Sequence, residues 1–315
     1  MHNTKFGIGT WGFGGSAYGD ISRGVVADIL GLAREFDVKL VDTSPSYGSG
    51  FCESIIGELG FFDSALVATK VGLLNHGPRD LELRSSFSKE DLNKSLELSL
   101  KRLKCSRLDL LQIDSMSKED LKKIPSVVTF MEEARNLGKI AAYGFSLKNP
   151  SDIDYVMRNS APSFIQVNFS LMDQRILDYS MFETISNAGV ELIARTPLHY
   201  GFLTESFKLN IGKNQHLGNW PKEQLHKWTA RAEEFRKLAH RFDLSIEALA
   251  FSFIRTAKLI SYVIPGVMSI GQLKCLHIAF QSRLLTPSEF LEVRKLYKET
   301  EGSRSVVSPY LRVQD

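Results

Sequence analysis

Eight short apolar runs alternate with amphipathic stretches along this chain, and this alternation limits the folds that are open to it. Most of the runs are almost continuously apolar, which is typical of strands buried on both faces of a parallel sheet. They cover residues 6–13, 39–44, 65–72, 107–115, 140–147, 164–171, 190–198 and 261–267. Eight strands with helices between them predict an α/β protein with the (β/α)8, or TIM, barrel fold.

The intervals between the runs contain apolar residues at helical spacing. This pattern predicts helices over residues 24–36, 88–103, 125–138, 222–242, 245–257 and 286–299. Ser88 and Asp91 stand where a helix begins, in a pattern that resembles a capping box, and Gly138 stands where another helix ends. The segment 199–221, after the seventh run, is the longest irregular stretch, and its length predicts a functional loop.

Length, charge and cysteine content narrow the class of protein. The 315 residues fit one barrel of about 250 residues with extensions, and no Pro-, Gly- or Ser-rich linker divides them, so we expect a single domain over 1–315. The net charge of +3 is dispersed, which predicts neither a nucleic-acid partner nor a membrane surface. Three widely spaced cysteines predict no disulfide framework and no metal site. With no apolar run of about 18 residues and no signal segment, we expect a soluble cytoplasmic protein.

The glycines near the N-terminus match the pattern G-x-G-x-x-G at Gly7, Gly9 and Gly12. In a dinucleotide-binding Rossmann domain these glycines follow a buried strand and open a helix. Here only six residues precede Gly7, and the stretch "GFGGSAYGD" keeps the chain irregular after Gly12. The context therefore favours a short first strand with glycines where side chains would obstruct a cavity.

Polar residues stand at the carboxyl ends of the predicted strands, which is where barrel enzymes place their chemistry. In chain order these residues are Asp42, Tyr47, Lys70, Asp114, Ser146, Gln166, Asn168 and Arg195. The pKa of a free tyrosine is about 10, and a nearby lysine ammonium lowers it by favouring the phenolate. An aspartate beside that lysine keeps the lysine charge from being buried alone. Such a trio suits proton transfer to a carbonyl oxygen while a hydride reaches the carbon.

Several stretches together resemble the aldo-keto reductase family. The stretch "VDTSPSYGSGFCESIIGE" resembles the family motif in which Asp and Tyr stand five residues apart, and "VATKVG" resembles its lysine strand. Further stretches match later family segments in order, namely "DLNKSLELSLKRLKCSRLDLLQID", "FIQVNFSLMDQR", "GVELIARTPLHYGFLT" and "SYVIPGVMSIGQL". The resemblance runs from about Gly7 to Leu276. It implies a (β/α)8 barrel that reduces small-molecule carbonyls with NADP(H), or less often NAD(H), bound without a Rossmann domain. It also implies a monomer or a weak homo-oligomer.

The resemblance assigns roles around the reacting centre. It makes Tyr47 the general acid, Lys70 the residue that tunes it, and Asp42 the partner of Lys70. It places Ser146 and Gln166 on the nicotinamide carboxamide.

The same resemblance assigns the rest of the cofactor path. Leu198, Gly201 and Leu203 line the pyrophosphate path, largely through their backbone. Arg195 stands against the nicotinamide or a phosphate, and Gln272 lies near the adenosine.

Aromatic residues complete the expected cavity. We expect Trp11 and Phe13 to wall the substrate cavity, with core packing as the alternative. The same alternatives hold for Trp220 and Trp228, with core packing favoured for Trp228.

Four positions depart from the family pattern. Asp114 stands where the family has a catalytic histidine, and an ionised carboxylate cannot donate a hydrogen bond to a substrate carbonyl. Leu147 replaces an asparagine that contacts the carboxamide, and Leu276 replaces one near the adenine. Met268 replaces the arginine that would hold the 2′-phosphate, so the expected NADP could give way to NAD.

These departures leave alternatives open. Asp114 is either a replacement donor in protonated form, as reduction of an activated C=C bond would require, or a sign of lost activity. His76 or His199 could supply the missing imidazole. A catalytically weakened cofactor-binding or regulatory protein on the same fold is the rival to a carbonyl reductase. The neighbourhood of "VDTSPSYG" most resembles relatives that act on sugars or small aldehydes.

Overall fold

The computed structural model describes residues 3–15, 17–61, 64–74, 84–114, 116–178, 185, 187–209 and 215–300. The expected position of His76 lies outside these ranges. Within them, no helix is both long enough and apolar enough to cross a membrane.

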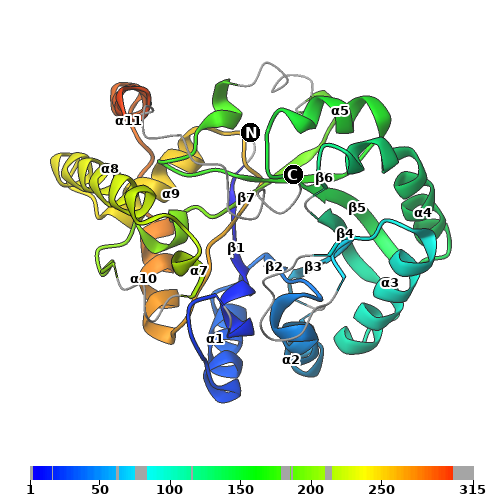
Figure 1. Ribbon diagram of the computed structural model, residues 1–315. Coiled ribbons are helices and arrows are strands. Elements are labelled where there is room, and N and C mark those ends of the chain that lie inside the picture. The colour runs from blue at the N-terminus through cyan, green and yellow to red at the C-terminus, as the bar shows by residue number, and fades with distance from the viewer. Residues whose placement is uncertain are drawn as a thin grey trace.

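The described residues form eight parallel strands that close into a barrel in the order β1 to β8, with β1 pairing with β8. The strands gather at the centre of Figure 1 and the helices surround them. The strands are β1 (Lys5–Gly9), β2 (Leu40–Asp42), β3 (Leu66–Val71), β4 (Leu108–Asp114), β5 (Ile140–Ser146), β6 (Phe164–Asn168), β7 (Glu191–Arg195) and β8 (Tyr262–Ile264). The predicted (β/α)8 fold is confirmed, and each predicted run contains its strand, except that β1 begins at Lys5, one residue before its run.

All six helices predicted from the sequence are present, with bounds that agree to within about two residues, and the structure contains further helices that were not predicted. The bounds are α1 (Arg23–Glu35), α2 (Phe51–Leu59), α3 (Lys89–Leu103), α4 (Ile124–Asn136), α5 (Asp152–Asn159), α7 (Gln215–Gly218), α8 (Lys222–Arg241), α9 (Ile246–Thr256), α10 (Ile270–Phe280) and α11 (Pro287–Glu299). The Ser88 hydroxyl accepts from the backbone N–H of Asp91, which confirms it as an N-cap. The full reciprocal capping box forms at Thr286 and Glu289 instead.

Side chains that point into the barrel form an apolar layer below a polar one, because alternate residues of a strand share a face. The apolar layer contains Leu40, Ala68, Leu110, Phe164, Ile193, Tyr262 and Ile264. Two residues further along their strands stand Asp42, Lys70, Gln112, Gln166 and Arg195. The apolar layer fills the barrel, and the polar layer above it forms the floor of a site.

Gly7 shows why glycines stand in β1. A Cβ atom at Gly7 would lie 2.8 Å from the Leu40 carbonyl oxygen and 2.9 Å from Cγ2 of Ile264, so a side chain would push neighbouring strands apart. Gly9 and Gly12 line the cavity above the barrel. The G-x-G-x-x-G match thus reflects close packing at a barrel rim, and no helix begins at Gly12, where a short 3-10 turn η1 (Trp11–Gly14) stands.

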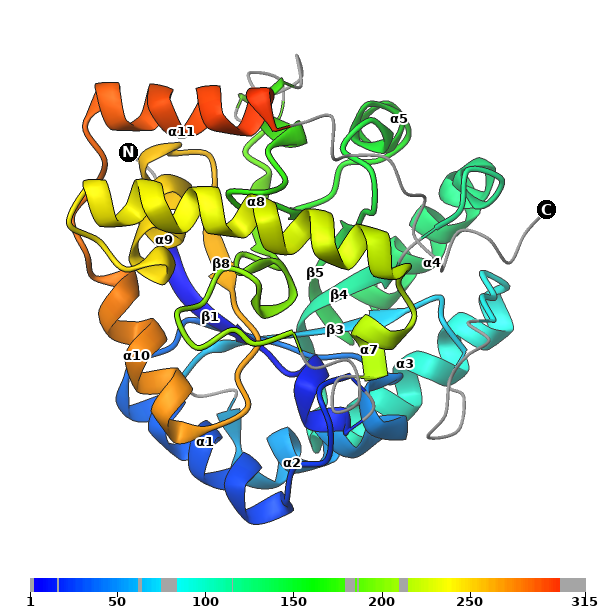
Figure 2. The ribbon, with the colours of Figure 1, turned by 60° about the vertical axis from the view of Figure 1, so that its left-hand side comes forward.

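A second, larger apolar core lies between the strands and the surrounding helices, whose inward faces are buried. Burying one Leu or Phe side chain in such a layer contributes roughly 1.5–3 kcal/mol. On one side, α8 and α11 run side by side and cover α9 (Figure 2). This packing carries α8 up to the rim of the barrel, where two of its residues, Trp228 and Arg231, line the cavity.

Candidate active site

Asp42 is the centre of the polar layer. Its Oδ2 accepts a hydrogen bond from Lys70 Nζ at 2.6 Å. Its Oδ1 accepts from the side-chain amides of Gln112 at 3.0 Å and Gln166 at 2.8 Å. All four side chains are buried. A buried carboxylate is stable only when its charge is paired and its oxygens are hydrogen-bonded, and both conditions are met here.

Lys70 connects this layer to Tyr47. Its ammonium also donates to the Thr43 carbonyl at 2.9 Å and to the Tyr47 hydroxyl at 3.3 Å. Burial acts to lower the pKa of Lys70, but the charges of Asp42, Tyr47 and Asp114 and the hydrogen bond to Asp42 together outweigh it, so the pKa is raised above its ordinary value. Lys70 therefore stays a cation beside the phenol.

Tyr47 begins a tight turn, η2 (Tyr47–Gly50), in the loop that follows β2. Burial raises the pKa of Tyr47 to about 12, although Lys70 acts to lower it. From the sequence, Lys70 is expected to lower this pKa, but burial has the larger effect and raises it. The phenol therefore keeps its proton at neutral pH and can serve as an acid.

Asp114 ends β4 and is buried at 6% exposure. Its negative charge raises the pKa values of both Tyr47 and Lys70, so Asp114 is close enough to interact electrostatically with both residues. It is not among the described residues that line the cavity, whereas Tyr47 is.

A cavity of about 1050 Å³ lies above the polar layer. Its wall includes many of the residues singled out in the sequence, namely Trp11, Asp42, Tyr47, Gln166, Arg195, Leu198, Gly201 and Gln272. Phe13 is a correction, whereas Leu203, which the resemblance places on the pyrophosphate path largely through its backbone, stays a prediction. Both side chains are packed in the apolar core, at 2% and 0% exposure, and neither belongs to the cavity wall. The η1 turn directs Phe13 inward, and the turn after β7 directs Leu203 inward.

Two residues of the site were not predicted from the sequence, Gln112 in the polar layer and Lys148 in the cavity wall. Gln112 is the only polar residue in the apolar run "LLQI", and that exception was the available signal. Lys148 follows β5, lines the cavity and is half-buried. Burial lowers the pKa of Lys148, the charge of Asp114 opposes this, and Arg195 adds to it. Nothing in the local pattern around Lys148 pointed to the cavity.

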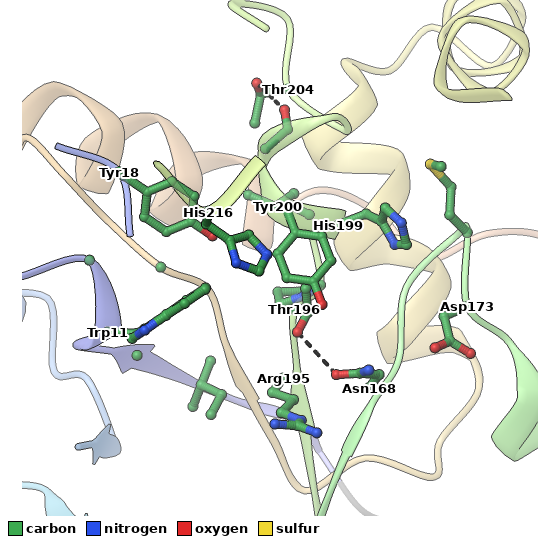
Figure 3. Close-up of a pocket in the computed structure, with 18 of the residues that line it drawn as sticks. Trp11, Tyr18, Asn168, Asp173, Arg195, Thr196, His199, Tyr200, Thr204 and His216 are labelled. Carbon is green, nitrogen blue, oxygen red and sulfur yellow. Dashed lines mark hydrogen bonds between the residues drawn. The ribbon is translucent and has the colours of Figure 1, made fainter. Parts of the chain in front are cut away.

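The turn after β7 is conformationally strained. Thr196, His199, Tyr200 and Gly201 all have positive φ, at 56°, 44°, 58° and 92°. This region costs a β-branched residue such as Thr196 roughly 1–3 kcal/mol. Thr196 Oγ1 donates to the side-chain oxygen of Asn168 at 3.1 Å, which helps to hold the turn (Figure 3). The turn carries Tyr200 and Gly201 into the cavity wall.

The described parts of the predicted loop 199–221 form one side of the cavity. The His216 N–H donates to the Ala17 carbonyl at 3.2 Å, which joins this loop to the one after β1. Figure 3 shows His216 between Trp11 and Tyr200, and its ring centroid is 4.7 and 4.6 Å from theirs. The loop contains η6 (His199–Gly201) and α7, so it is less irregular than predicted.

Further aromatic rings extend this wall. Trp220 and Trp228 both line the cavity, with centroids 4.7 Å apart, and both also pack against the core. Each of these tryptophans therefore both lines the cavity and packs against the core.

His199 faces away from Arg195, toward the side of the cavity that holds Asp173 (Figure 3). Its ring lies 4.8 Å from that of Trp228, and burial lowers its pKa to about 4. The imidazole is therefore neutral at physiological pH.

The chain's relationship to known proteins agrees with this geometry. The model of the aldo/keto reductase family matches residues 5–298. The chain belongs to this family. As an aldo-keto reductase it is an NAD(P)H-dependent oxidoreductase, and its relatives are named reductases and dehydrogenases.

Three relatives show the extent of the match. The NADH-specific methylglyoxal reductase of Escherichia coli (strain K12) is 23% identical over 86% of this chain and 88% of that protein. The L-galactose dehydrogenase of Arabidopsis thaliana is 26% identical over 87% of this chain and 85% of that protein. The glycerol dehydrogenase structure from Gluconobacter oxydans has a TM-score of 0.78 at 23% identity, covering 95% of this chain and 92% of that one. At 23% identity, the structural similarity shows that the two proteins share a fold.

Two buried polar groups fit a nicotinamide group: Arg195 is in the described cavity wall, and Ser146, outside that wall, stands beside the wall residue Gln166 on the neighbouring strand. Ser146 Oγ and Arg195 Nε are buried and have no hydrogen-bond partner among the described residues. The carboxamide of nicotinamide has an N–H donor and a carbonyl acceptor. It can therefore serve as a hydrogen-bond partner for both the Ser146 hydroxyl and the Arg195 guanidinium. Arg195 is also anchored, because its Nη2 donates to the Leu147 carbonyl at 3.1 Å.

Proposed function

We propose that this aldo-keto reductase reduces the carbonyl group of a small aldehyde, ketone or sugar, with Tyr47 as the general acid. One observation carries the proposal. Tyr47 belongs to the wall of a large cavity, and its hydroxyl receives a hydrogen bond from the buried Lys70 ammonium at 3.3 Å. An acid that touches the cavity and is backed by a fixed cation suits a substrate on which negative charge develops.

The electrons and protons of the proposed reduction balance. Reduced nicotinamide, when bound, supplies a hydride to the carbonyl carbon. The electrons of the C=O π bond move to the oxygen, and Tyr47 donates its proton there. The Lys70 ammonium then faces the phenolate and stabilises its charge, while Asp42 holds Lys70 in position. In the oxidative direction the same phenolate accepts the alcohol proton.

Ser146, Gln166 and Arg195 would hold the nicotinamide, with Leu198 and Gly201 along the pyrophosphate and Gln272 near the adenosine. The resemblance predicts NADPH as the cofactor, and Met268 leaves NADH open. The resemblance also predicts a monomer or a weak homo-oligomer.

The substrate class follows from the walls. Trp11 and Tyr18 form an aromatic side at a centroid distance of 5.5 Å, and Asn168 and Lys148 form a polar side. Aromatic faces beside polar groups suit a short hydroxylated carbonyl compound. The names of the relatives, a methylglyoxal reductase and an L-galactose dehydrogenase, support the same class.

The position of Asp114 bears on the alternatives. A proton donor for an activated C=C bond has to reach the substrate, and Asp114 stands outside the described cavity wall. This favours carbonyl reduction. The complete set of contacts among Asp42, Lys70 and Tyr47 likewise favours an enzyme over a weakened regulatory protein.

Hydride transfer tests the proposal directly. Purified protein is supplied with NADH or NADPH deuterated at C4 and with a panel of short aldehydes, ketones and aldoses. We expect deuterium at the former carbonyl carbon of at least one product, detected by mass spectrometry. If the chain binds the cofactor but transfers no deuterium to any carbonyl, the proposal fails.

A further inference from the structure

The far end of the cavity, away from Tyr47, has an unusual charge. We define it by its wall residues in segment 201–206, in α9 and in segment 266–276, which are Gly201, Thr204, Glu205, Ser206, Glu247, Gly266, Met268, Gln272, Cys275 and Leu276. Glu205 and Glu247 are the charged members of this described set, and it contains no lysine or arginine.

The two glutamates sit at a seam between the loop after β7 and the start of α9. Glu247 Oε1 accepts from the backbone N–H of Glu205 at 2.8 Å, and Glu205 Oε1 accepts from the backbone N–H of Ile246 at 3.1 Å. Each bond engages only one oxygen of its carboxylate. The seam therefore fixes two acidic groups in the wall.

At the start of α10, on the other side of this end, two backbone donors are already engaged. A helix N-terminus commonly binds phosphate through its free backbone N–H groups. Here the Met268 N–H donates to Gln272 Oε1 at 2.7 Å, and the Gln272 N–H donates to Ser269 Oγ at 3.1 Å. Side chains of this turn already occupy those two donors.

Arg236 is a cation close to the seam, and its donors are engaged. It donates to the Thr204 carbonyl at 2.8 Å and to Glu233 at 2.9 Å, and its Nε lies 3.5 Å from Glu205. Its side chain is 18% exposed and is not part of the described cavity wall. It therefore leaves the far end without a free cation facing the ligand.

We propose that this chain selects NADH over NADPH, because Glu205 and Glu247 accept ribose hydroxyls and repel a 2′-phosphate. The inference rests on the proposed function, which places the adenosine at this end of the cavity. A 2′-phosphate brings up to two negative charges to a wall with two carboxylates, and Arg236, which pairs with Glu205, stands outside that wall. A 2′-hydroxyl is a hydrogen-bond donor, and Glu247 Oε2, outside the seam, is an acceptor, while Glu205 Oε2 lies 3.5 Å from Arg236 Nε.

Binding measurements on the full chain test this selection without relying on turnover. The dissociation constants of NADH and NADPH are measured by calorimetry at about 0.01 M and about 0.15 M salt. We expect NADH to bind at least tenfold tighter at low salt. We expect the gap to narrow as salt rises, because the screening length falls from about 30 Å to about 8 Å. NADPH binding as tightly as NADH would overturn the inference.

Variants identify the groups responsible. Glu247→Gln keeps an oxygen for the Glu205 N–H and removes one charge, so we expect NADPH to bind several-fold tighter. Met268→Arg adds a cation, and we expect a gain for NADPH of tenfold or more. Glu97→Gln, on α3, removes a carboxylate that pairs with Lys139 on the outer surface, and it should leave both constants unchanged.

The outcomes separate the two proposals. An unchanged NADH-to-NADPH ratio in Glu247→Gln would overturn the role given to the glutamates. Failure of the folded chain to bind either dinucleotide would instead overturn the proposed function, and this inference with it.

Discussion

Lys70 donates a hydrogen bond to the hydroxyl of Tyr47 across 3.3 Å, and the two residues come from different βα units of the barrel. The same ammonium lies 5.0 Å from the centre of the Tyr47 ring and 2.6 Å from Asp42. The buried Lys70 ammonium thus balances the Asp42 carboxylate below it, and it can also stabilise a phenolate on Tyr47 above it. This arrangement ties the stability of the barrel floor to the proposed chemistry.

Removing the phenol hydroxyl should abolish most turnover while sparing cofactor binding. General acid catalysis typically contributes about 10²- to 10⁴-fold, so we expect Tyr47→Phe to lower kcat by at least about 100-fold. The dissociation constant for the dinucleotide should change less than threefold, because the ring remains in the wall. Steady-state kinetics and calorimetry measure the two quantities. A variant with wild-type kcat would remove Tyr47 from the mechanism.

The raised pKa of Tyr47 predicts opposite pH profiles for the two directions. The acid form persists up to the folded pKa of about 12, so carbonyl reduction should not depend on this group between pH 6 and 10. Alcohol oxidation needs the phenolate, whose fraction rises about tenfold per pH unit below the pKa, so its kcat/KM should rise with pH. Stopped-flow rates in both directions check this. A loss of reduction rate centred between pH 7 and 9 would contradict it.

The buried ion pair should respond asymmetrically to mutation. Lys70→Met leaves the Asp42 charge buried without a cation, and we expect a loss of about 3–5 kcal/mol in the free energy of unfolding. The double variant Asp42→Asn/Lys70→Met should lose less than Lys70→Met alone, because no charge is left unpaired. Lys139→Met breaks an ion pair with Glu97 on the outer surface and should cost under about 1 kcal/mol. Denaturant titrations measure all three, and equal losses for the first two variants would refute the argument.

Gln112 and Gln166 form a matched pair, since both donate to the same oxygen of Asp42. Replacing either by Leu removes one donor from a buried carboxylate, and we expect each to cost about 1–3 kcal/mol of stability. Only Gln166 lines the cavity, so only Gln166→Leu should also weaken dinucleotide binding, by tenfold or more. Calorimetry on both variants distinguishes cofactor contact from support of Asp42. Equal weakening by both would show that Gln166 acts only through Asp42.

His199 should make the fold sensitive to mild acid. Burial lowers its pKa from an ordinary value of 6.5 to about 4 in the folded chain. Between these values the unfolded chain binds the proton first, so stability is full above pH 6.5 and falls as pH drops toward 4. One such group contributes up to about 1.4 kcal/mol per pH unit. In His199→Phe the free energy of unfolding should fall less steeply between pH 6.5 and 4.5, and an unchanged slope would contradict the assignment.

The sequence carried the architecture because its signals are local and repeated. Strands buried on both faces must be apolar along their length, and the helices between them must be amphipathic, so eight alternations were enough to predict the barrel. Asp42, Tyr47 and Lys70 could be placed together because parallel strands end at one rim. The role of Gln112 could not be predicted, because the sequence of an apolar strand does not show whether a single amide side chain faces the barrel interior or the helices.

Only the tertiary structure decided where individual side chains and charges act. Phe13 and Leu203 lie in tight turns, where a few backbone angles determine whether a side chain enters the core or the cavity, and sequence spacing does not encode those angles. The pKa of Tyr47 depends on the balance between burial and the charge of Lys70, and burial is a property of the whole fold. Glu205 and Glu247 are separated by more than forty residues, and they share a wall because the turn after β7 meets the start of α9. The sequence thus determined which elements form and which rim they share, whereas long-range packing determined which groups face the cavity and with what charge.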